Sequence, residues 1–88
     1  MPQINQSLLT EDDKRKFTFL FNQWLLPENV RDIAIKYGYK GNAYVYHVIK
    51  FRKRNSEIFN EAIEVALKNK QEHEESIQKI EKDFVTSN

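Results

Sequence analysis

The chain has 88 residues, of which 40% are hydrophobic and 31% charged, with two glycines, two prolines and no cysteine. This length corresponds to one domain, the scarcity of turn residues favours helices over a many-stranded β fold, and the lack of cysteine excludes disulfides and thiolate chemistry. No apolar run approaches the ~20 residues of a membrane-spanning helix, and the first residues lack the regions of a signal peptide. We therefore expect a cytoplasmic protein without membrane contact.

The small net charge of +1 conceals a strong segregation of charge along the chain. Residues 33–55 carry six Lys or Arg side chains and no Asp or Glu, whereas residues 56–88 carry eight acidic side chains against four basic ones. A field polarised in this way attracts a polyanion to one part of a molecule and repels it from another. The basic segment therefore favours a binding function over an ordinary solvated surface.

The first expected helix spans residues 11–25 and follows a polar N-terminal arm, residues 1–9, that we expect to be frayed. Thr10 is a suitable N-cap, because its hydroxyl can accept a hydrogen bond from a free amide of the first turn. Asp13, three residues later, completes a variant of the capping box. Apolar residues recur at helical spacing and predict a core-facing stripe that consists of Phe17, Leu20, Phe21, Trp24 and Leu25.

Two short helices are predicted next, over residues 27–37 and 43–52. Pro27 suits the first turn of a helix, and Gly38 can take the left-handed conformation that ends a helix without steric cost. Asn42 is the expected N-cap of the second short helix. On a helical wheel, the inner face of this helix is formed by Val45, Val48 and Ile49, and the outer face by Ala43, Tyr46, His47 and Lys50.

A long helix is expected over residues 56–84. Its first half carries a clean apolar stripe, which consists of Ile58, Phe59, Ala62, Ile63, Ala66 and Leu67. Beyond this point the stripe thins to Ile77, Ile80 and Phe84. Lys70 and His73 interrupt the heptad pattern that a coiled coil would need.

Together these elements predict an all-α fold, a small single-domain bundle of about four helices with a central helix-turn-helix and a long C-terminal helix. Along the chain we expect a flexible arm over residues 1–9, a helical domain over residues 10–69, and an acidic helical extension or tail over residues 70–88. The extension could form a homodimer, hold a protein partner, or remain a solvated end.

The two short helices resemble the helix-turn-helix of the phage repressor and Cro class of transcriptional regulators. The residues that carry the resemblance are Ile33, Ala34, Gly38, Val45, Val48 and Ile49. A small residue in the first helix lets the two helices approach, the glycine allows the tight turn, and the valines hold the second helix against the first. The resemblance covers about residues 30–65, and the turn is longer than is usual in the family, which leaves the rotation of the second helix open.

The resemblance implies a sequence-specific or accessory DNA-binding protein that docks residues 43–52 in the major groove. The residues expected to approach base edges are Asn42, Ala43, Tyr46, His47 and Lys50. The residues expected to hold phosphates are Lys36, Lys40, Arg52, Lys53 and Arg54. Because one helix reads only a few base pairs, such a protein would act as a dimer or beside other factors.

Other functions remain open or find no support in the sequence. A small helical adaptor, whose basic face meets an acidic protein partner, is the alternative to DNA binding, and RNA is not distinguished from double-stranded DNA. No glycine-rich phosphate loop, nucleophile-and-base motif or carboxylate pair points to an enzyme. The two histidines are 26 positions apart and there is no cysteine, so neither a metal site nor a cofactor is expected.

Overall fold

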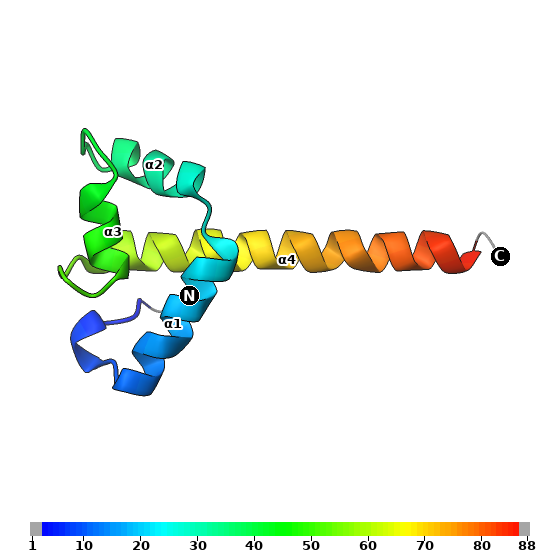
Figure 1. The fold of residues 1–88 in the computed structure, drawn as a ribbon, viewed down its shortest axis with the longest axis horizontal. Helices are drawn as coiled ribbons and strands as arrows, with labels where there is room; N and C mark the ends of the chain where they lie inside the picture. The colour runs from blue at the N-terminus through cyan, green and yellow to red at the C-terminus, as the bar shows by residue number, and fades with distance from the viewer. Residues whose placement is uncertain (1–2, 87–88) are drawn as a thin grey trace.

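The computed structural model describes residues 3–86 and confirms the all-α fold (Figure 1). Within these residues there are four α-helices and no strand, namely α1 (Glu11–Trp24), α2 (Pro27–Lys36), α3 (Ala43–Ile49) and α4 (Ser56–Thr86), preceded by a single 3₁₀ turn, η1 (Gln6–Leu8). The three shorter helices gather around the first half of α4. The second half of α4 projects away from them, so that the molecule is 52 Å long.

Local signals mark the start of α1 and the end of α2. The Thr10 hydroxyl accepts a hydrogen bond from the Asp13 N–H (3.1 Å), and the Thr10 N–H donates to the Asp13 carboxylate (3.0 Å), which completes the capping box of α1. The backbone and hydroxyl of Thr10 thereby hold the pKa of Asp13 below its ordinary value, because their hydrogen bonds favour the carboxylate form. Gly38 follows α2 in the left-handed region, with φ at 81°.

The core lies between the first half of α4 and the three shorter helices, with Phe59 fully buried near its centre. The ring centroid of Phe59 lies 5.3 Å from that of Phe17, 5.7 Å from that of Phe21 and 5.6 Å from that of Phe51. The buried apolar residues around this aromatic cluster are Val30, Ile33, Ala34, Val45, Val48, Ile49, Ile58, Ala62, Ile63 and Ala66. The predicted inner faces of all four helices therefore meet in one core.

The prediction that α3 continues to residue 52 was wrong, since α3 ends at Ile49. Phe51 takes the left-handed conformation with φ at 65°, and the Arg52 N–H turns back to donate to the His47 carbonyl (2.8 Å). This conformation costs a non-glycine residue about 1–3 kcal/mol. Packing of the Phe51 ring on Phe59 offsets that cost, so a contact with the core ends the helix. α1 and α2 each end one residue earlier than predicted.

Residues 3–9, the described part of the N-terminal arm, lie against the body of the protein. The Ile4 N–H donates to the Asn60 side-chain oxygen (2.8 Å), and the Asn60 side-chain amide donates to the Ile4 carbonyl (3.0 Å). Ile4 and Leu9 also pack partly buried against the core. The segment is therefore paired with α4 by a two-point hydrogen bond that the local sequence does not indicate.

Gln6 is the one buried polar residue in the described part of the chain, with 7% of its surface exposed. Its amide nitrogen donates to the Val48 carbonyl of α3 (3.3 Å), and its side-chain oxygen accepts from the Asn55 N–H just before α4 (2.8 Å). One side chain thus bridges the two ends of the loop formed by residues 50–54. A buried amide with both groups paired is stabilising, whereas the loss of one partner leaves a polar group unsatisfied.

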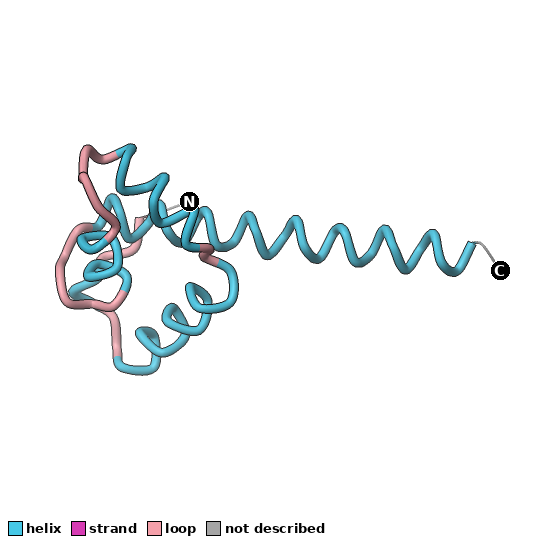
Figure 2. The backbone as a smooth tube through the Cα atoms, turned by 45° about the horizontal axis from the view of Figure 1, so that its top comes forward, coloured by secondary structure: helices cyan, strands magenta, loops and turns pink. Residues whose placement is uncertain are grey.

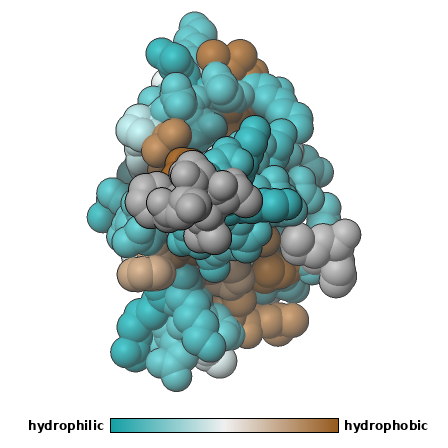
Figure 3. Space-filling model, turned by 90° about the vertical axis from the view of Figure 1, so that its right-hand side faces the viewer, coloured by the Kyte–Doolittle hydropathy of each residue, from teal (hydrophilic) through white to brown (hydrophobic). Residues whose placement is uncertain are grey.

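The second half of α4 projects beyond the other helices after its first turn, where the ring centroid of His73 lies 5.1 Å from that of Trp24 in α1. The Asn69 side-chain amide donates to the Trp24 carbonyl (2.8 Å) and to the Asn29 side-chain oxygen (3.0 Å). Every described side chain from residue 70 to residue 83 is exposed, including Ile77 (41%) and Ile80 (65%). Viewed from the C-terminal end, the surface is mostly hydrophilic with small, separate apolar patches (Figure 3).

The side chain of Phe84, which was expected to continue the thin apolar stripe, lies outside the described residues. α4 itself runs two residues further than expected. Between residues 3 and 86, none of the helices combines the length and the apolar character that crossing a bilayer requires.

The bridge formed by Gln6 predicts a large effect for a single truncation. Gln6→Ala should lower the free energy of unfolding by about 1–3 kcal/mol, because it leaves the Val48 carbonyl and the Asn55 N–H without their partner. The measurement is urea unfolding followed by far-ultraviolet circular dichroism. Gln3→Ala is the matched control, since Gln3 is exposed. Equal midpoints for the two variants would show that the bridge does not stabilise the fold.

Candidate nucleic-acid interface

α2 and α3 are joined by a short turn, residues 37–42, at the end of the molecule opposite the C-terminus (Figure 2). The Tyr39 N–H donates to the Ala34 carbonyl (2.8 Å), which closes the end of α2 around Gly38. Ala34 is 1% exposed, and Val45 and Val48 are fully buried. The small side chain and the two valines therefore lie in the interface between the helices, which fixes the outer face of α3 relative to α2.

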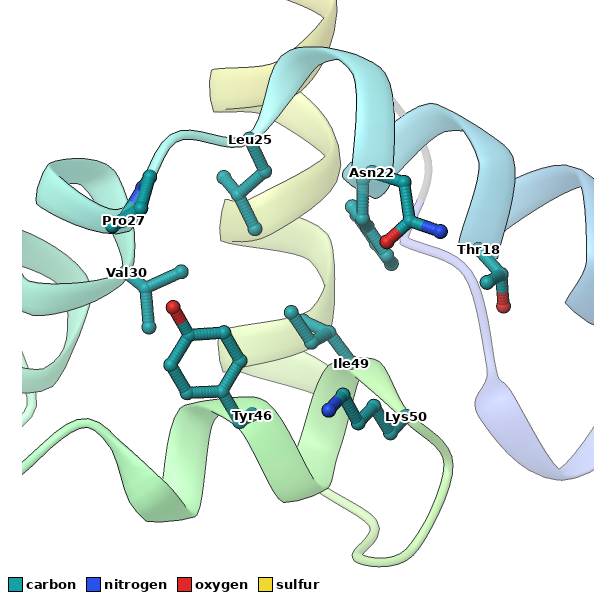
Figure 4. A pocket seen from close by; sticks show the side chains of 9 residues that line it. Thr18, Asn22, Leu25, Pro27, Val30, Tyr46, Ile49 and Lys50 are labelled. Carbon is teal, nitrogen blue, oxygen red and sulfur yellow. The ribbon is translucent and has the colours of Figure 1, made fainter.

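The five residues predicted to approach bases differ in their exposure to solvent. Ala43 and Lys50 are exposed, and Asn42 and His47 are half-buried. Asn42 occupies the N-cap position, but its side chain makes no capping hydrogen bond, contrary to the prediction. Tyr46 packs against the core, with its hydroxyl turned toward α2 (Figure 4), and the Lys50 ammonium lies 5.7 Å from its ring centroid. Of the five, the exposed residues are thus Ala43 at the start of α3 and Lys50 directly after its end.

Residues 50–54, which we call the basic loop, connect α3 to α4. Arg52, Lys53 and Arg54 are exposed, and their side chains form no ion pair or hydrogen bond with any residue in the described range 3–86. The His47 carbonyl accepts hydrogen bonds from the N–H groups of Arg52 (2.8 Å) and Lys53 (3.2 Å). The backbone of the loop is therefore held in place while its cationic side chains remain free to bind.

The two remaining predicted phosphate-binding residues differ from each other. Lys40 lies exposed in the turn between α2 and α3, without a carboxylate partner in the part of the chain that is described. Lys36 forms an ion pair with Glu61 of α4, with 2.5 Å between Nζ and Oε1. The hydrogen bond to Glu61 raises the pKa of Lys36 above its ordinary value. The charge of Lys36 is thus already matched within the protein.

The structure adds Lys14 of α1 to the surface around the basic loop. A hollow of about 150 Å³ is lined by Gln6, Ser7, Leu9, Lys14, Phe51, Lys53 and Arg54. The Lys14 ammonium lies 5.9 Å from the ring centroid of Phe51 and 3.5 Å from the Glu11 carboxylate. Nothing in the sequence pairs Lys14 with the loop, because the two are distant along the chain and meet only through the packing of Phe51.

The segregation of charge along the sequence is kept in space in part, although Glu11 lies next to Lys14 beside the basic loop. The basic loop and the turn between α2 and α3 lie at one end of the long axis, and the acidic second half of α4 extends to the other (Figure 1). No cluster of three or more metal-ligating side chains occurs within the described residues.

No protein-family model matches the sequence, and neither the curated proteins nor the solved structures give a significant match. The function is therefore inferred from the shape, charge and side chains of this surface.

The ion pair of Lys36 predicts a change in its titration. Glu61→Gln should lower the pKa of Lys36, because the hydrogen bond to the carboxylate is the largest cause of its raised value. The resonance of the Lys36 side-chain CH₂ next to the ammonium, followed by NMR as the pH rises, measures this change. Glu72→Gln is the control, since Glu72 lies on the exposed half of α4.

The direction of the linkage follows from the sign of the shift. A raised pKa means that the pair adds to stability below the usual lysine pKa, and that this contribution is lost as the pH rises through the raised value. An unchanged titration of Lys36 in the Glu61→Gln protein would show that the pair does not persist in solution.

Proposed function

We propose that this protein binds nucleic acid, with double-stranded DNA as its ligand, through the outer face of α3 and the basic loop. One observation carries the proposal. Five cationic side chains gather at one end of the molecule without a carboxylate partner among residues 3–86, namely those of Lys40, Lys50, Arg52, Lys53 and Arg54. Cations left unmatched within a protein are available to replace the counterions of a phosphate backbone.

The basic loop would supply the contacts that do not depend on sequence. Arg52 and Arg54 can donate to phosphate oxygens in pairs, and Lys53 adds a compact charge. The hollow beside the loop brings Lys14 next to Lys53 and Arg54, and the Glu11 carboxylate, 3.5 Å from the Lys14 ammonium, offsets part of that charge. Contacts of this kind fix the position and register of a protein on a duplex.

The face of α3 would supply the contacts that read bases. Lys50 suits the acceptor atoms of guanine, Asn42 the N7 acceptor and N6 amino donor of adenine, and the methyl group of Ala43 that of thymine. His47 lies on the same outer face between them. Because Tyr46 is turned toward α2, we assign it a supporting contact with Lys50 and not a base contact of its own.

Replacing two arginines of the basic loop tests the proposal. The double variant Arg52→Gln and Arg54→Gln should bind random-sequence duplex DNA more weakly than the unaltered protein. The slope of log affinity against log salt should flatten by about 0.9 for each lost phosphate contact. Fluorescence anisotropy between about 50 and 200 mM salt measures both quantities.

The matched control is Lys68→Gln with Lys79→Gln, which removes the same charge from α4. An equal loss of affinity in this control would mean that net charge and not the basic loop governs binding. Absence of any binding by the unaltered protein at the lowest salt would overturn the proposal. The basic face would then favour the alternative, an adaptor that meets an acidic protein partner.

The exposed half of α4 is a candidate for a second contact surface, at which two copies of the chain would meet. α3 has seven residues, and one such helix reads too few base pairs to specify a site. Ile77 and Ile80 are neighbours on one helical face and are 41% and 65% exposed. We assign this face to contact with a second copy of the chain, which would present two α3 helices to one duplex.

Removing the two isoleucines tests the dimer. Ile77→Gln with Ile80→Gln should convert a dimer into a monomer, because it removes the apolar area that the contact would bury. Analytical ultracentrifugation over a range of protein concentrations measures the association. The control, Lys79→Gln with Glu81→Gln, changes polar residues of the same stretch and should leave the dimer intact. A monomer at every concentration of the unaltered protein would exclude this contact.

A further inference from the structure

A pocket opens between α1, α2 and α3, with α4 behind it (Figure 4). Its volume is about 570 Å³, within the range of about 300–1,000 Å³ typical of small-molecule sites. The residues that line it are Thr18, Phe21, Asn22, Leu25, Pro27, Val30, Tyr46, Ile49 and Lys50. α1 packs chiefly on α4, while α2 and α3 pack on each other and on α4, which leaves this space between the two groups of helices.

The lining has an apolar side and a polar side. Leu25, Pro27 and Val30 lie together across from the aromatic ring of Tyr46, whereas Thr18 and Asn22 project from α1 on the other side (Figure 4). Among residues 3–86, no Asp or Glu lines the pocket, and Lys50 is the only charged residue that does. A concave apolar wall with a few polar groups to one side is the usual form of a small-molecule site.

The polar groups of the pocket are not engaged elsewhere. The side chains of Thr18, Asn22 and Tyr46 make no hydrogen bond to another residue in the described range 3–86. The Lys50 ammonium has no carboxylate partner there and lies beside the Tyr46 ring, at 5.7 Å from its centroid. One cation and three neutral hydrogen-bonding groups are therefore available to a ligand.

We infer that this pocket binds a small apolar carboxylate, of the kind represented by a medium-chain fatty acid. The chain lies against Leu25, Pro27 and Val30, and the carboxylate meets the ammonium of Lys50. The charge complementarity decides the class of ligand. A cation bound here would face Lys50 with no acid to balance it, whereas a carboxylate gains a charge-assisted contact that a neutral chain does not make.

Binding in this pocket has a consequence that rests on the proposed function. Tyr46 of α3 and Lys50, which directly follows α3, both line the pocket, so an occupied pocket holds the Lys50 ammonium against the ligand and away from a base edge. A ligand that competes for this side chain lowers the affinity for DNA, and DNA lowers the affinity for the ligand by the same factor. The pocket would then make DNA binding responsive to the carboxylate.

The experiment measures binding of three probes that share one chain, namely decanoate, 1-decanol and decylammonium. Methyl NMR of the full chain reports the site directly, because Thr18, Leu25, Val30 and Ile49 carry methyl groups that line it. Decanoate should shift these resonances at lower concentration than decanol, and decylammonium should bind most weakly. All probes are kept below the concentrations at which they aggregate.

Two variants and one control locate the binding. Lys50→Gln should lower the affinity for decanoate about tenfold or more, the equivalent of one charge-assisted contact, and leave the affinity for decanol unchanged. Asn22→Trp fills the mouth of the pocket from an exposed position and should abolish binding of all three probes. Lys16→Gln removes a charge from an exposed residue of α1 that does not line the pocket, and should change nothing.

The possible results distinguish the ligand class, the site and the nucleic-acid function from one another. Equal affinity for decanoate and decanol, or an unchanged decanoate affinity in the Lys50→Gln protein, would overturn the assignment of a carboxylate. The absence of methyl shifts with every probe would overturn the site itself. Decanoate binding by a protein that does not bind DNA would leave the pocket assigned and refute the nucleic-acid function. If both hold, decanoate should weaken DNA binding of the unaltered protein but not of the Asn22→Trp variant.

Discussion

The buried face of the first half of α4 is the constraint on which the rest of the structure depends. α1, α2 and α3 each pack on it, and Phe59 contacts aromatic rings from α1 and from the basic loop. Full burial of one such side chain contributes roughly 1.5–3 kcal/mol. In a chain of this length, where the apolar core is small, that contribution decides where the connecting segments run.

The basic loop shows how this constraint reaches the surface. Phe51 is held in a left-handed conformation by its contact with Phe59, and Gln6 bridges the backbone on either side of the loop. The chain therefore turns directly after α3, and Arg52, Lys53 and Arg54 point into solvent beside that helix. A phosphate-binding segment held in this way would lose less conformational entropy on binding than a free tail, which is why we place it at the centre of the proposed function.

α3 contributes both to the pocket and to the surface proposed to contact DNA. Val45 and Val48 fix one side of α3 in the core, so its rotation is set. This rotation turns Tyr46 toward α2 and leaves Ala43 exposed and His47 half-buried. Lys50 lies at the boundary of the two surfaces. The proposed base contacts and the proposed carboxylate site therefore share a side chain. Binding of a ligand at one site is expected to alter binding at the other.

Local patterns of residues were enough to predict the helices of this protein. The signals that predicted them act within one or two helical turns, namely the spacing of apolar residues, the capping box of Thr10 and Asp13, and the glycine after α2. The predicted ends of the four helices lie within two residues of the observed ends, except for the end of α3. The tertiary structure alone decided the end of α3, the bridge of Gln6, the pairing of Lys36 with Glu61, the position of Lys14 and the pocket. Each of these joins side chains that are distant in the chain, and such contacts depend on how the helices pack around α4, which no local pattern of residues encodes.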